Sequence, residues 1–382
     1  MVRYVLDVRT VTPHFPGIGR YVHNLAREVP AMLADNEELV LLAQTGGSFP
    51  GTDTTPSDKV SKVETSATPF SLRQQWKVPR LLRVQAKSCG TRAVYHSSYY
   101  LMPYRIPCPA LLTIYDTISL TYPETVSFRA RTLFRLTTML ALRASVGIIT
   151  ISDATRRDLE THFTVDPKRV TTIYLGVDEA FRPRPKQEQE NVRVSFRQPG
   201  DFLLYFGSNK PHKNLVRLVD AYALLAAQCS RENAMLPSLL IAGAWDDQYP
   251  EAKQQVAHHR LGDRIRFLGP IDDADLPALY SAAMAFVFPS LYEGFGLPVL
   301  EAMACGVPVA CSAASSLPEV AGDAAFYFDP KDVGSIALAL RALIGDGALR
   351  ANLSQRGLQR ASEFTWRSTA SKTLDLYRAV YQ

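Results

Sequence analysis

The residues best suited to chemistry lie in the stretch 289–312, which reads PSLYEGFGLPVLEAMACGVPVACS. Glu293 and Glu301 have seven residues between them, and this spacing separates the two carboxylates along a ligand instead of pairing them as an acid and a base. Gly294 and Gly296 leave the backbone exposed just before an expected helix. A helix start beside glycines is suited to bind a pyrophosphate. The alternative is an ordinary strand, turn and helix with surface glutamates.

A second candidate is FGSNKPHKNLVRLVDAY, residues 206–222, in which a strand runs into a loop and a helix. Lys213 lies just before that helix, where its charge would stabilise the negative charge that develops on a departing diphosphate. Its neighbour His212 can donate only two hydrogen bonds and is mostly neutral at pH 7. The alternative for Lys213 is a solvated lysine at a helix start.

Three further groups follow strands in the first half of the chain. Gly17-Ile18-Gly19 opens a helix, but the third glycine of a dinucleotide-binding fingerprint is missing, so a simple helix-start loop is the alternative. A tyrosine and an aspartate end ALLTIYD, and the aspartate could equally cap its own loop. The third group follows AVYHSS, where a histidine is as often structural as ligand-binding. The members of the last two groups are Tyr115, Asp116, His96, Ser98 and Tyr99.

The stretch 289–312 resembles the signature of retaining glycosyltransferases of family 4, in which two glutamates are separated by seven residues. This resemblance implies that Glu293 contacts the hydroxyl groups of a donor sugar and that Glu301 holds the ribose. It also implies that the loop with Lys213 grips phosphates and that backbone groups at 266–268 meet the nucleobase. The implied donor-binding set is Gly17, Gly19, Gly207, Asn209, His212, Lys213, Arg266, Phe267, Leu268, Glu293, Gly294, Phe295, Gly296, Leu297 and Glu301.

The same resemblance implies roles for the remaining candidates. Glu293, Lys213 and Asp116 form the expected catalytic set, and no metal site is expected because lysine and helix N–H groups neutralise the diphosphate. The sequence departs from the family pattern at His212, where the family has arginine, and at Tyr115, where relatives have histidine. Tyrosine has a pKa near 10 and is a poor base at neutral pH. The implied acceptor-side set is Tyr21, His96, Ser98, Tyr99 and Tyr115.

Short apolar strands alternate with helical patterns along the chain, which predicts an α/β protein with parallel sheets. Because the pattern restarts after a polar, proline-marked segment, we expect two doubly wound Rossmann-like domains. Together with the resemblance, this predicts the GT-B fold, with both domains facing a central cleft. The expected boundaries are an N-terminal domain over 1–183, a linker over 184–200, a C-terminal domain over 201–362, and a last helix over 363–382 that could pack back across the junction.

Composition narrows the class of protein further. The 382 residues are too many for one ordinary core, and no apolar stretch is long enough to span a membrane. The N-terminus has charges inside its apolar run and does not read as a signal peptide. Five cysteines, including Cys89, show no metal-binding spacing, which favours a cytoplasmic protein without disulfides.

The net charge of +5 is unevenly spread, because residues 1–185 carry 23 Lys/Arg against 16 Asp/Glu. Residues 71–92 hold six basic and no acidic residues, and residues 127–145 are also basic, with apolar residues interleaved in both stretches. Basic amphipathic helices favour anionic lipid surfaces, so the sequence suggests peripheral contact at the inner face of the cytoplasmic membrane. The alternative is that the apolar faces cover the sheet and the arginines are solvated.

The combined expectation is a metal-independent, retaining glycosyltransferase that moves a hexose from a nucleotide sugar to a glycan or a lipid-linked acceptor. Mannose from GDP-mannose is favoured over UDP-sugars by the resemblance to bacterial mannosyltransferases, and no cofactor is expected. A catalytically inactive relative that binds nucleotide sugar or glycan is the first rival, favoured by His212 and Tyr115. A nucleic-acid-binding protein is the second, but the sequence lacks any recognised reader motif.

Overall fold

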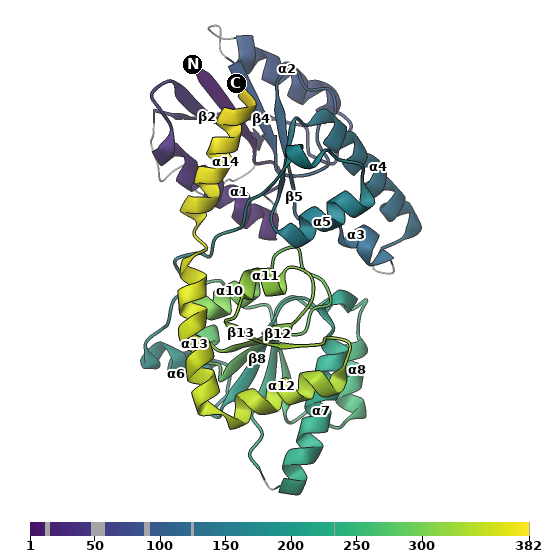
Figure 1. The fold of residues 1–382 in the computed structure, drawn as a ribbon, viewed down its shortest axis with the longest axis vertical. Coiled ribbons are helices and arrows are strands. Elements are labelled where there is room, and N and C mark those ends of the chain that lie inside the picture. The colour runs from purple at the N-terminus through teal and green to yellow at the C-terminus, as the bar shows by residue number, and fades with distance from the viewer. Residues whose placement is uncertain (12–15, 47–57, 88–91, 124–125, 233, 382) are drawn as a thin grey trace. The chain divides into compact units, whose positions relative to one another are not determined.

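The computed structural model describes residues 1–11, 16–46, 58–87, 92–123, 126–232 and 234–381. The chain divides into two compact units (Figure 1): Met1–Gly176 with Thr365–Gln382, and Val177–Phe364. Each unit contains one parallel sheet with helices on both faces, as the alternating strands and helices predict. Cys89 and the rest of 88–91 in the first basic stretch lie outside the described residues.

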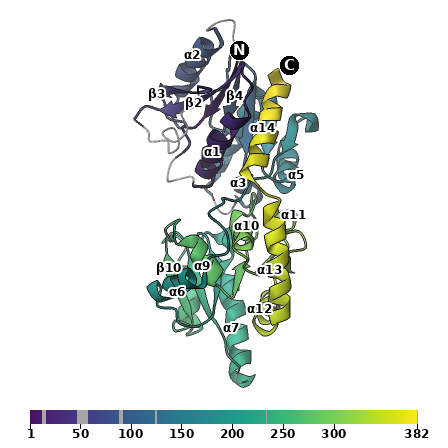
Figure 2. The ribbon, with the colours of Figure 1, turned by 90° about the vertical axis from the view of Figure 1, so that its left-hand side faces the viewer.

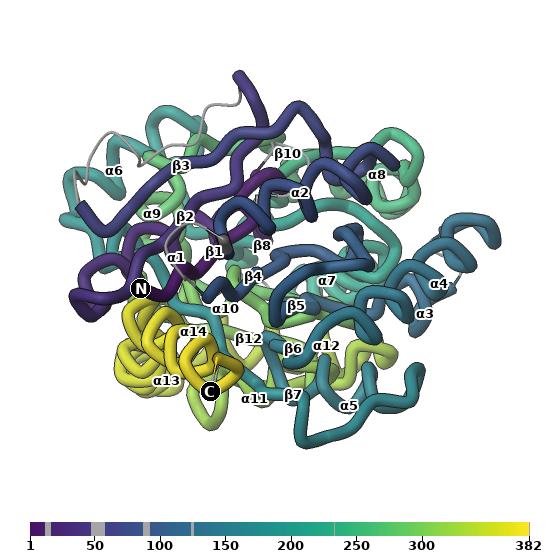
Figure 3. The backbone as a smooth tube through the Cα atoms, turned by 90° about the horizontal axis from the view of Figure 1, so that it is seen from above, coloured from purple at the N-terminus to yellow at the C-terminus, as the bar shows by residue number. Residues whose placement is uncertain are grey.

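The described strands of the first unit form a sheet in the order β3-β2-β1-β4-β5-β6-β7, which can be followed in Figure 3. Parallel strands covered on both faces must be apolar throughout, and every residue of β5 and β6 is buried. The elements are β1 (Val2–Asp7), α1 (Pro16–Glu28), β2 (Glu37–Gln44), β3 (Val60–Thr65), α2 (Gln74–Lys87), β4 (Arg92–Ser97), β5 (Ala110–Ile114), α3 (Ile118–Thr121), α4 (Phe128–Ala144), β6 (Gly147–Thr150), α5 (Asp153–His162), β7 (Val170–Thr172) and α14 (Trp366–Tyr381).

Neighbouring residues of β1 show which helices cover each face of this sheet. Val5 belongs to a core cluster with Leu82 of α2, Leu142 of α4 and Leu159 of α5. Tyr4 points to the opposite face, where its ring lies 5.0 Å from that of Tyr377 in α14. Helices α2, α4 and α5 therefore cover one face, while α1 and α14 lie side by side on the other (Figures 2 and 3).

The second unit has the strand order β10-β9-β8-β11-β12-β13, in which the direction of strand addition reverses between β8 and β11. Helix α7 packs against α12, α10 against α13, and α6 against α9. The elements are α6 (Lys186–Ser195), β8 (Phe202–Phe206), a 3-10 turn (Pro211–Lys213), α7 (Leu215–Glu232), β9 (Ser238–Ala242), α8 (Glu251–His258), β10 (Ile265–Gly269), α9 (Leu276–Ala282), β11 (Ala285–Phe288), α10 (Leu297–Ala304), β12 (Val309–Ser312), α11 (Leu317–Ala321), β13 (Ala325–Phe328), α12 (Val333–Gly345) and α13 (Gly347–Ser362).

The segment 184–200, expected to be a linker, instead contains α6 and belongs to the second unit. Its polar composition reflects a surface helix that buries little beyond Val192 against the rest of the unit. The chain passes between the units at 176–177 and again at 364–365. The last helix, α14, packs within the first unit, so the first unit is completed by the C-terminal end of the chain.

Polar contacts at Tyr377 and Arg378 help to tie α14 to the first unit. The hydroxyl of Tyr377 lies 2.7 Å from Nδ1 of His96, and the Arg378 guanidinium forms two bonds to the Glu37 carboxylate, at 2.8 and 2.7 Å. Gly176 permits the close approach of the helix start, because a Cβ there would lie 2.2 Å from the backbone nitrogen of Trp366. Among the described helices, none is both long and apolar enough to cross a bilayer.

The contact between Arg378 and Glu37 should make the stability of the first unit depend on acid. Arg378, helped by the amide of Ala34 and the hydroxyl of Tyr4, lowers the pKa of Glu37 to about 2 despite burial. A lowered carboxyl pKa stabilises the folded state above the unfolded value of 4.5, and this contribution is lost as the pH falls toward 2. Because Arg378 is 39% exposed, solvent screens part of the effect.

We expect Glu37→Gln to lower the free energy of unfolding at pH 7 by about 2 kcal/mol. The difference between the two proteins should shrink between about pH 4.5 and pH 2, as wild-type Glu37 becomes protonated. Urea unfolding of both proteins across this range is the measurement. A difference that stays constant with pH would show that the carboxylate charge contributes nothing.

Candidate functional site

Lys213 and Glu293 form an ion pair at the carboxyl end of the second sheet. Lys213 Nζ lies 2.6 Å from Glu293 Oε1, and the two side chains are only 16% and 12% exposed. Lys213 follows β8 and Glu293 follows β11, and these two strands are paired neighbours. In doubly wound sheets, ligands bind where the direction of strand addition reverses. The two residues that the sequence assigns to catalysis from stretches 80 positions apart therefore meet at such a place.

Asn214 fixes the loop that presents Lys213. Its backbone adopts the left-handed conformation, with φ of 62°, which asparagine tolerates better than most residues. Its buried amide group donates to the carbonyl oxygens of Pro289 at 3.0 Å and Pro330 at 2.7 Å. The backbone N–H of Leu291 also donates to the carbonyl of His212 at 2.7 Å. The loops after β8 and β11 are thus tied to each other beside the ion pair.

The loop with Glu293 is held by two serines that the sequence analysis missed. The Ser315 hydroxyl donates to the carbonyl of Glu293 at 2.7 Å. The Ser316 hydroxyl lies between that carbonyl, at 2.9 Å, and the carbonyl of Phe295, at 2.8 Å. The side chain of Phe295 is itself buried, which anchors the loop to the protein interior. A serine pair following β12 gives no signal in the sequence until the fold places it against this loop.

Helix α10 begins at the end of the Glu293 loop. Gly296 has φ of 105°, and a Cβ there would lie 2.6 Å from Cδ2 of Leu317, so this position requires glycine. Leu297 is the first helical residue, and the positive end of the helix dipole lies at this point. Gly294 shares the same turn. The glycine-flanked helix start expected from the sequence is present beside the ion pair.

Glu301 lies one turn further along α10. Its side chain is buried, and the hydroxyl of Tyr280 in α9 lies 3.3 Å from Oε2. The spacing between the two glutamates thus places Glu293 on the loop and Glu301 inside the helix, at separate points as expected. Contact between Glu301 and a ribose stays a prediction.

His212 occupies the place where the family has arginine. The side chain is buried, and Nδ1 makes no hydrogen bond within the part of the chain that the structure describes. Burial, followed by the nearby charges of Lys213 and Lys210, lowers the pKa of His212 to about 3. The ring is therefore neutral at pH 7 and offers a phosphate a hydrogen bond but no charge.

A pocket of about 240 Å³ opens at the ends of β8, β9 and β10. Glycine at 207 and 243 lets two backbone segments touch, because a Cβ on Gly243 would lie 2.3 Å from the Gly207 carbonyl oxygen. Trp245 packs edge-on against Phe267 with ring centroids 5.1 Å apart, and Lys253 Nζ lies 4.1 Å from the centre of the Trp245 ring. The residues that line the pocket include Gly207, Asn209, Gly243, Trp245, Lys253, Phe267 and Leu268.

The residues that line this pocket beyond the sequence-derived set include Trp245 and Lys253. Trp245 and Lys253 carry no motif in the sequence and were missed, although an aromatic after a buried strand was available as a weak signal. The Arg266 guanidinium donates to the carbonyl of Arg197 at 3.1 Å, and Arg266 is not among the pocket residues. The expected contact between its backbone and a nucleobase stays a prediction. Asn209 is held by the 246–249 loop through its amide group, with bonds of 2.7 to 2.8 Å.

In the first unit, His96 and Ser98 are core residues. Both ring nitrogens of His96 are occupied, by Tyr377 and by Thr113 at 2.7 Å, and burial lowers the pKa of His96 to about 3. Ser98 is buried and donates to the carbonyl of Asp7 at 2.9 Å. A buried polar group is stable only when it is hydrogen-bonded, and both side chains are hydrogen-bonded within the protein. They therefore have structural roles, contrary to the expectation that they contact an acceptor.

The expected acceptor-side tyrosines differ in exposure. Tyr21 is buried, with its hydroxyl 3.2 Å from the hydroxyl of Thr113, so the structure does not place it at a surface. Tyr99 and Tyr115 are partly exposed as whole residues, but the hydroxyl of Tyr115 is buried. The hydroxyl of Tyr99 donates to that of Tyr100 at 3.0 Å. Burial raises the pKa of Tyr115 well above 10, which removes it further from any role as a base.

The remaining candidates of the first unit lie at helix starts. Asp116 accepts a hydrogen bond from the backbone N–H of Ile118 at 3.1 Å. This bond corresponds to the loop-capping role that the sequence offers as the alternative to catalysis. Gly17 and Gly19 were expected in a loop but lie in the first turns of α1, which begins at Pro16. Proline suits the first helical position and moves the helix start ahead of both glycines. Among the described residues, no group of three or more His, Cys, Asp or Glu side chains is placed to hold a metal ion.

Comparison with known proteins decides the family. A model described as Glycosyltransferase Family 4 matches residues 16–181, and one described as Glycosyl transferases group 1 matches residues 186–360. O-antigen chain mannosyltransferase B of Escherichia coli is 33% identical over 383 residues, covering 95% of this chain and 96% of that protein. This chain belongs to glycosyltransferase family 4. The glycosyltransferase also resembles the MMP alpha-(1->4)-mannosyltransferase of Mycolicibacterium hassiacum, 30% identical over 60% of this chain and 53% of that protein.

Solved structures confirm the GT-B class of fold. Sucrose-phosphate synthase from Thermosynechococcus elongatus matches with a TM-score of 0.74 at 21% identity, over 100% of this chain and 99% of that one. WaaG, a glycosyltransferase involved in lipopolysaccharide biosynthesis, matches with a TM-score of 0.70 at 16% identity, over 99% of each chain. At these identities the likeness concerns the fold alone. The glycosyltransferase thus has the two Rossmann-like domains that the sequence predicts.

Glu293→Gln should lower glycosyl transfer by about a hundredfold or more, because the side chain keeps its size but loses the charge that pairs with Lys213. The variant should unfold at the same denaturant concentration within error, since its backbone is held by Ser315 and Ser316. Single-turnover assays and urea unfolding are the measurements. Glu251→Gln, an exposed acid on α8, is the matched control. A loss below about tenfold, or 1.4 kcal/mol in the barrier, would remove Glu293 from the catalytic set.

Proposed function

We propose that this glycosyltransferase moves mannose, with retention of configuration, from a nucleotide diphosphate sugar to a glycan or lipid-linked acceptor. The observation that carries the proposal is the half-buried pair of Lys213 and Glu293 at the start of α10, between the loops of β8 and β11. Mannose is favoured because relatives from Escherichia coli and Mycolicibacterium hassiacum are named mannosyltransferases. GDP-mannose is the preferred donor over UDP-sugars by the same reasoning.

In this proposal, the donor spans the second unit. The nucleobase enters the pocket formed by Trp245, Phe267 and Leu268, where an aromatic face and backbone groups suit a flat heterocycle. The diphosphate lies against Lys213 and the N-terminus of α10, where a cation and the helix dipole both favour negative charge. Glu293 contacts the sugar hydroxyls. Because Lys213 and the helix start neutralise the charge of the diphosphate, a metal ion is not needed for that purpose. Activity should therefore survive chelation of metal ions by EDTA.

The chemistry follows from that placement. The acceptor oxygen attacks the anomeric carbon on the face from which the diphosphate leaves, and the carbon–oxygen bond to the diphosphate breaks. The proton of the acceptor hydroxyl passes to an oxygen of the leaving phosphate, so a side-chain base is not required. This suits a chain in which Tyr115 replaces a histidine and its pKa is raised by burial. Lys213 stabilises the charge that grows on the leaving group.

The acceptor side belongs to the first unit, and its surface supports a membrane role. Helix α2 buries Val78 and Leu82 in the core but leaves Trp76 60% exposed, next to the exposed Arg80 and Arg83. An exposed tryptophan beside arginines suits the interface of an anionic bilayer. We therefore place the enzyme in the cytoplasm, at the inner face of the cytoplasmic membrane, with a lipid-linked glycan as the favoured acceptor.

Donor choice is tested with a panel of nucleotide sugars. GDP-mannose should give the highest kcat/KM, and GDP should bind more tightly than UDP by calorimetry. Lys213→Ala should weaken GDP binding and turnover together, because the lysine meets the phosphates before and during bond cleavage, while the exposed Lys186→Ala should match the wild type. GDP affinity that is unchanged in Lys213→Ala would reject the phosphate assignment, and preference for a UDP-sugar would reject the donor.

Membrane contact is tested by sedimentation with vesicles. The protein should bind vesicles that contain phosphatidylglycerol, bind neutral ones weakly, and be released by salt. Arg80→Gln with Arg83→Gln should lower partitioning about thirtyfold, at roughly 1 kcal/mol per basic residue. The control is Lys186→Gln with Lys331→Gln, two exposed lysines of the second unit. Equal losses in both double variants would indicate net charge alone, and no binding at low salt would leave α2 as a solvated surface.

A further inference from the structure

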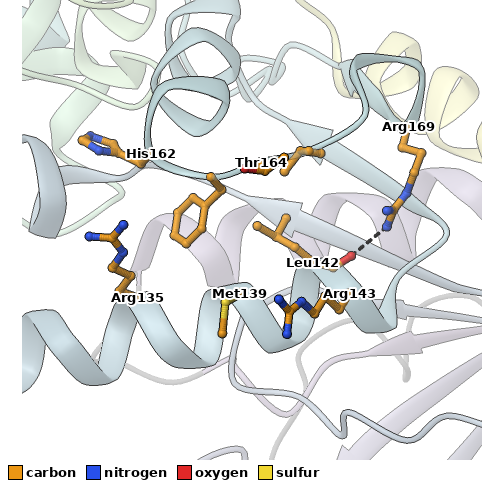
Figure 4. Close-up of a pocket in the computed structure, with 9 residues that line it drawn as sticks. Arg135, Met139, Leu142, Arg143, His162, Thr164 and Arg169 are labelled. Atoms are coloured by element: carbon orange, nitrogen blue, oxygen red, sulfur yellow. Dashed lines mark hydrogen bonds between the residues drawn. The ribbon is translucent and has the colours of Figure 1, made fainter.

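A second pocket of about 240 Å³ lies in the first unit and shares no residue with the donor or acceptor sets (Figure 4). It opens between α4, the end of α5 and the turn before β7. Leu142 and Phe163 give it a buried apolar floor, and three arginines and a histidine surround that floor. Its lining residues are Arg135, Met139, Leu142, Arg143, His162, Phe163, Thr164, Val165 and Arg169.

Helix geometry explains why two of the arginines flank one opening. Arg135, Met139 and Arg143 are spaced four residues apart, so they lie on one face of α4. The two arginines are separated by eight residues, or about 12 Å along the helix. Met139 and Leu142 lie between them and offer apolar surface. The pocket therefore presents two cations at the ends of an apolar strip.

The third arginine is held rigidly. Arg169 donates to the carbonyl of Leu142 at 2.7 Å (Figure 4). It also donates to the carbonyls of Ser145 and Val146. These carbonyls lie at the C-terminal end of α4, whose partial negative charge would otherwise repel an anion. The positive charge of Arg169 offsets the partial negative charge at this helix end. Its hydrogen bonds also hold the guanidinium in a fixed position beside the pocket. A preorganised guanidinium loses little entropy when a ligand binds.

The arginines around this pocket have no carboxylate partner among the residues that the structure describes. Within the described ranges no ion pair involves Arg135, Arg143 or Arg169, whereas other arginines of the unit, such as Arg3 and Arg156, pair with glutamates. Cations gathered around an apolar floor repel one another and attract an anion that brings an apolar group. Guanidinium groups match the geometry of phosphate oxygens in particular.

We propose that this pocket binds a phosphate group that is attached to an apolar portion, with the phosphate between the arginines and the apolar part on Leu142 and Phe163. An anionic lipid headgroup and a soluble phosphorylated molecule share this chemistry. The exposed side chains of α4 favour the lipid, because Phe128 is 72% exposed and lies two turns before Arg135 on the same face. The site is separate from the donor site and does not depend on the sugar that is transferred.

The test compares pocket and surface arginines on the full chain. Arg135→Gln with Arg143→Gln removes two pocket cations. Arg129→Gln with Arg157→Gln removes two exposed cations of the same helices that do not line the pocket. Sedimentation with phosphatidylcholine vesicles, with and without phosphatidate, probes the lipid. Calorimetry with dihexanoyl phosphatidate below its micelle concentration, in the presence of saturating GDP, probes a free phosphorylated ligand.

The pocket variant should bind phosphatidate vesicles about thirtyfold more weakly, and the control variant less than about fivefold more weakly. Binding of the dispersed short-chain ligand that is lost only in the pocket variant identifies a soluble ligand as sufficient. Binding to vesicles without binding of the dispersed short-chain ligand identifies a membrane lipid as the source of the phosphate group. Met139→Trp, which fills the pocket without changing charge, should reproduce the loss. Equal losses in the pocket and control variants, or full binding by Met139→Trp, would overturn the proposal.

Discussion

The position of Asn214 is the constraint on which the candidate site at the carboxyl end of the second sheet depends. Its amide group binds carbonyls that follow β11 and β13, while its left-handed backbone ends the turn that presents Lys213. One side chain thus fixes three loops around the place where strand addition reverses. Because an unsatisfied buried carbonyl costs about 1–3 kcal/mol, replacement of this amide would loosen the loops and separate the charges they carry. The sheet topology brings the loops near, and Asn214 sets their distance.

A comparable polar network shapes the first unit, but it serves the core. Arg9 and Asp7 form a buried pair at the end of β1, with Arg9 Nη2 2.6 Å from Asp7 Oδ2, and the hydroxyl of Tyr95 donates to the same carboxylate. His96 joins β4 to α14 through Tyr377. Since these groups satisfy one another, they cannot serve an acceptor without breaking buried bonds. Among the expected acceptor-side residues, Tyr99 and Tyr115 are the partly exposed ones, and their contact with an acceptor stays a prediction.

Periodicity predicts most strands of both sheets and the helix at 297, because buried parallel strands and glycine-bounded helices leave strong local patterns. It gives little signal for β3, an edge strand in which Ser61, Lys62, Glu64 and Thr65 are polar. It mistakes α6 for a linker, because a surface helix buries little. The motif finds Lys213 and Glu293. It misplaces His96, since burial is decided by α14, which arrives from 280 residues later in the chain. The positions of Lys253, Ser315 and Ser316 depend on tertiary contacts and leave no local signal, and Trp245 leaves only the weak signal of an aromatic residue after a buried strand.

The neutral state of His212 changes the charge balance of the proposed donor complex. With no charge on His212, Lys213 is the partly buried cation of its turn, and in the structure it is paired with Glu293 at 2.6 Å. A diphosphate that approaches Lys213 must compete with that carboxylate. Glu293 can give up the lysine only if other donors replace it, and the hydroxyl groups of a sugar are such donors. A complete donor supplies both replacements at once, whereas a bare nucleoside diphosphate leaves Glu293 without one. In the proposed donor complex, recognition of the phosphates and of the sugar would therefore be coupled through a single ion pair.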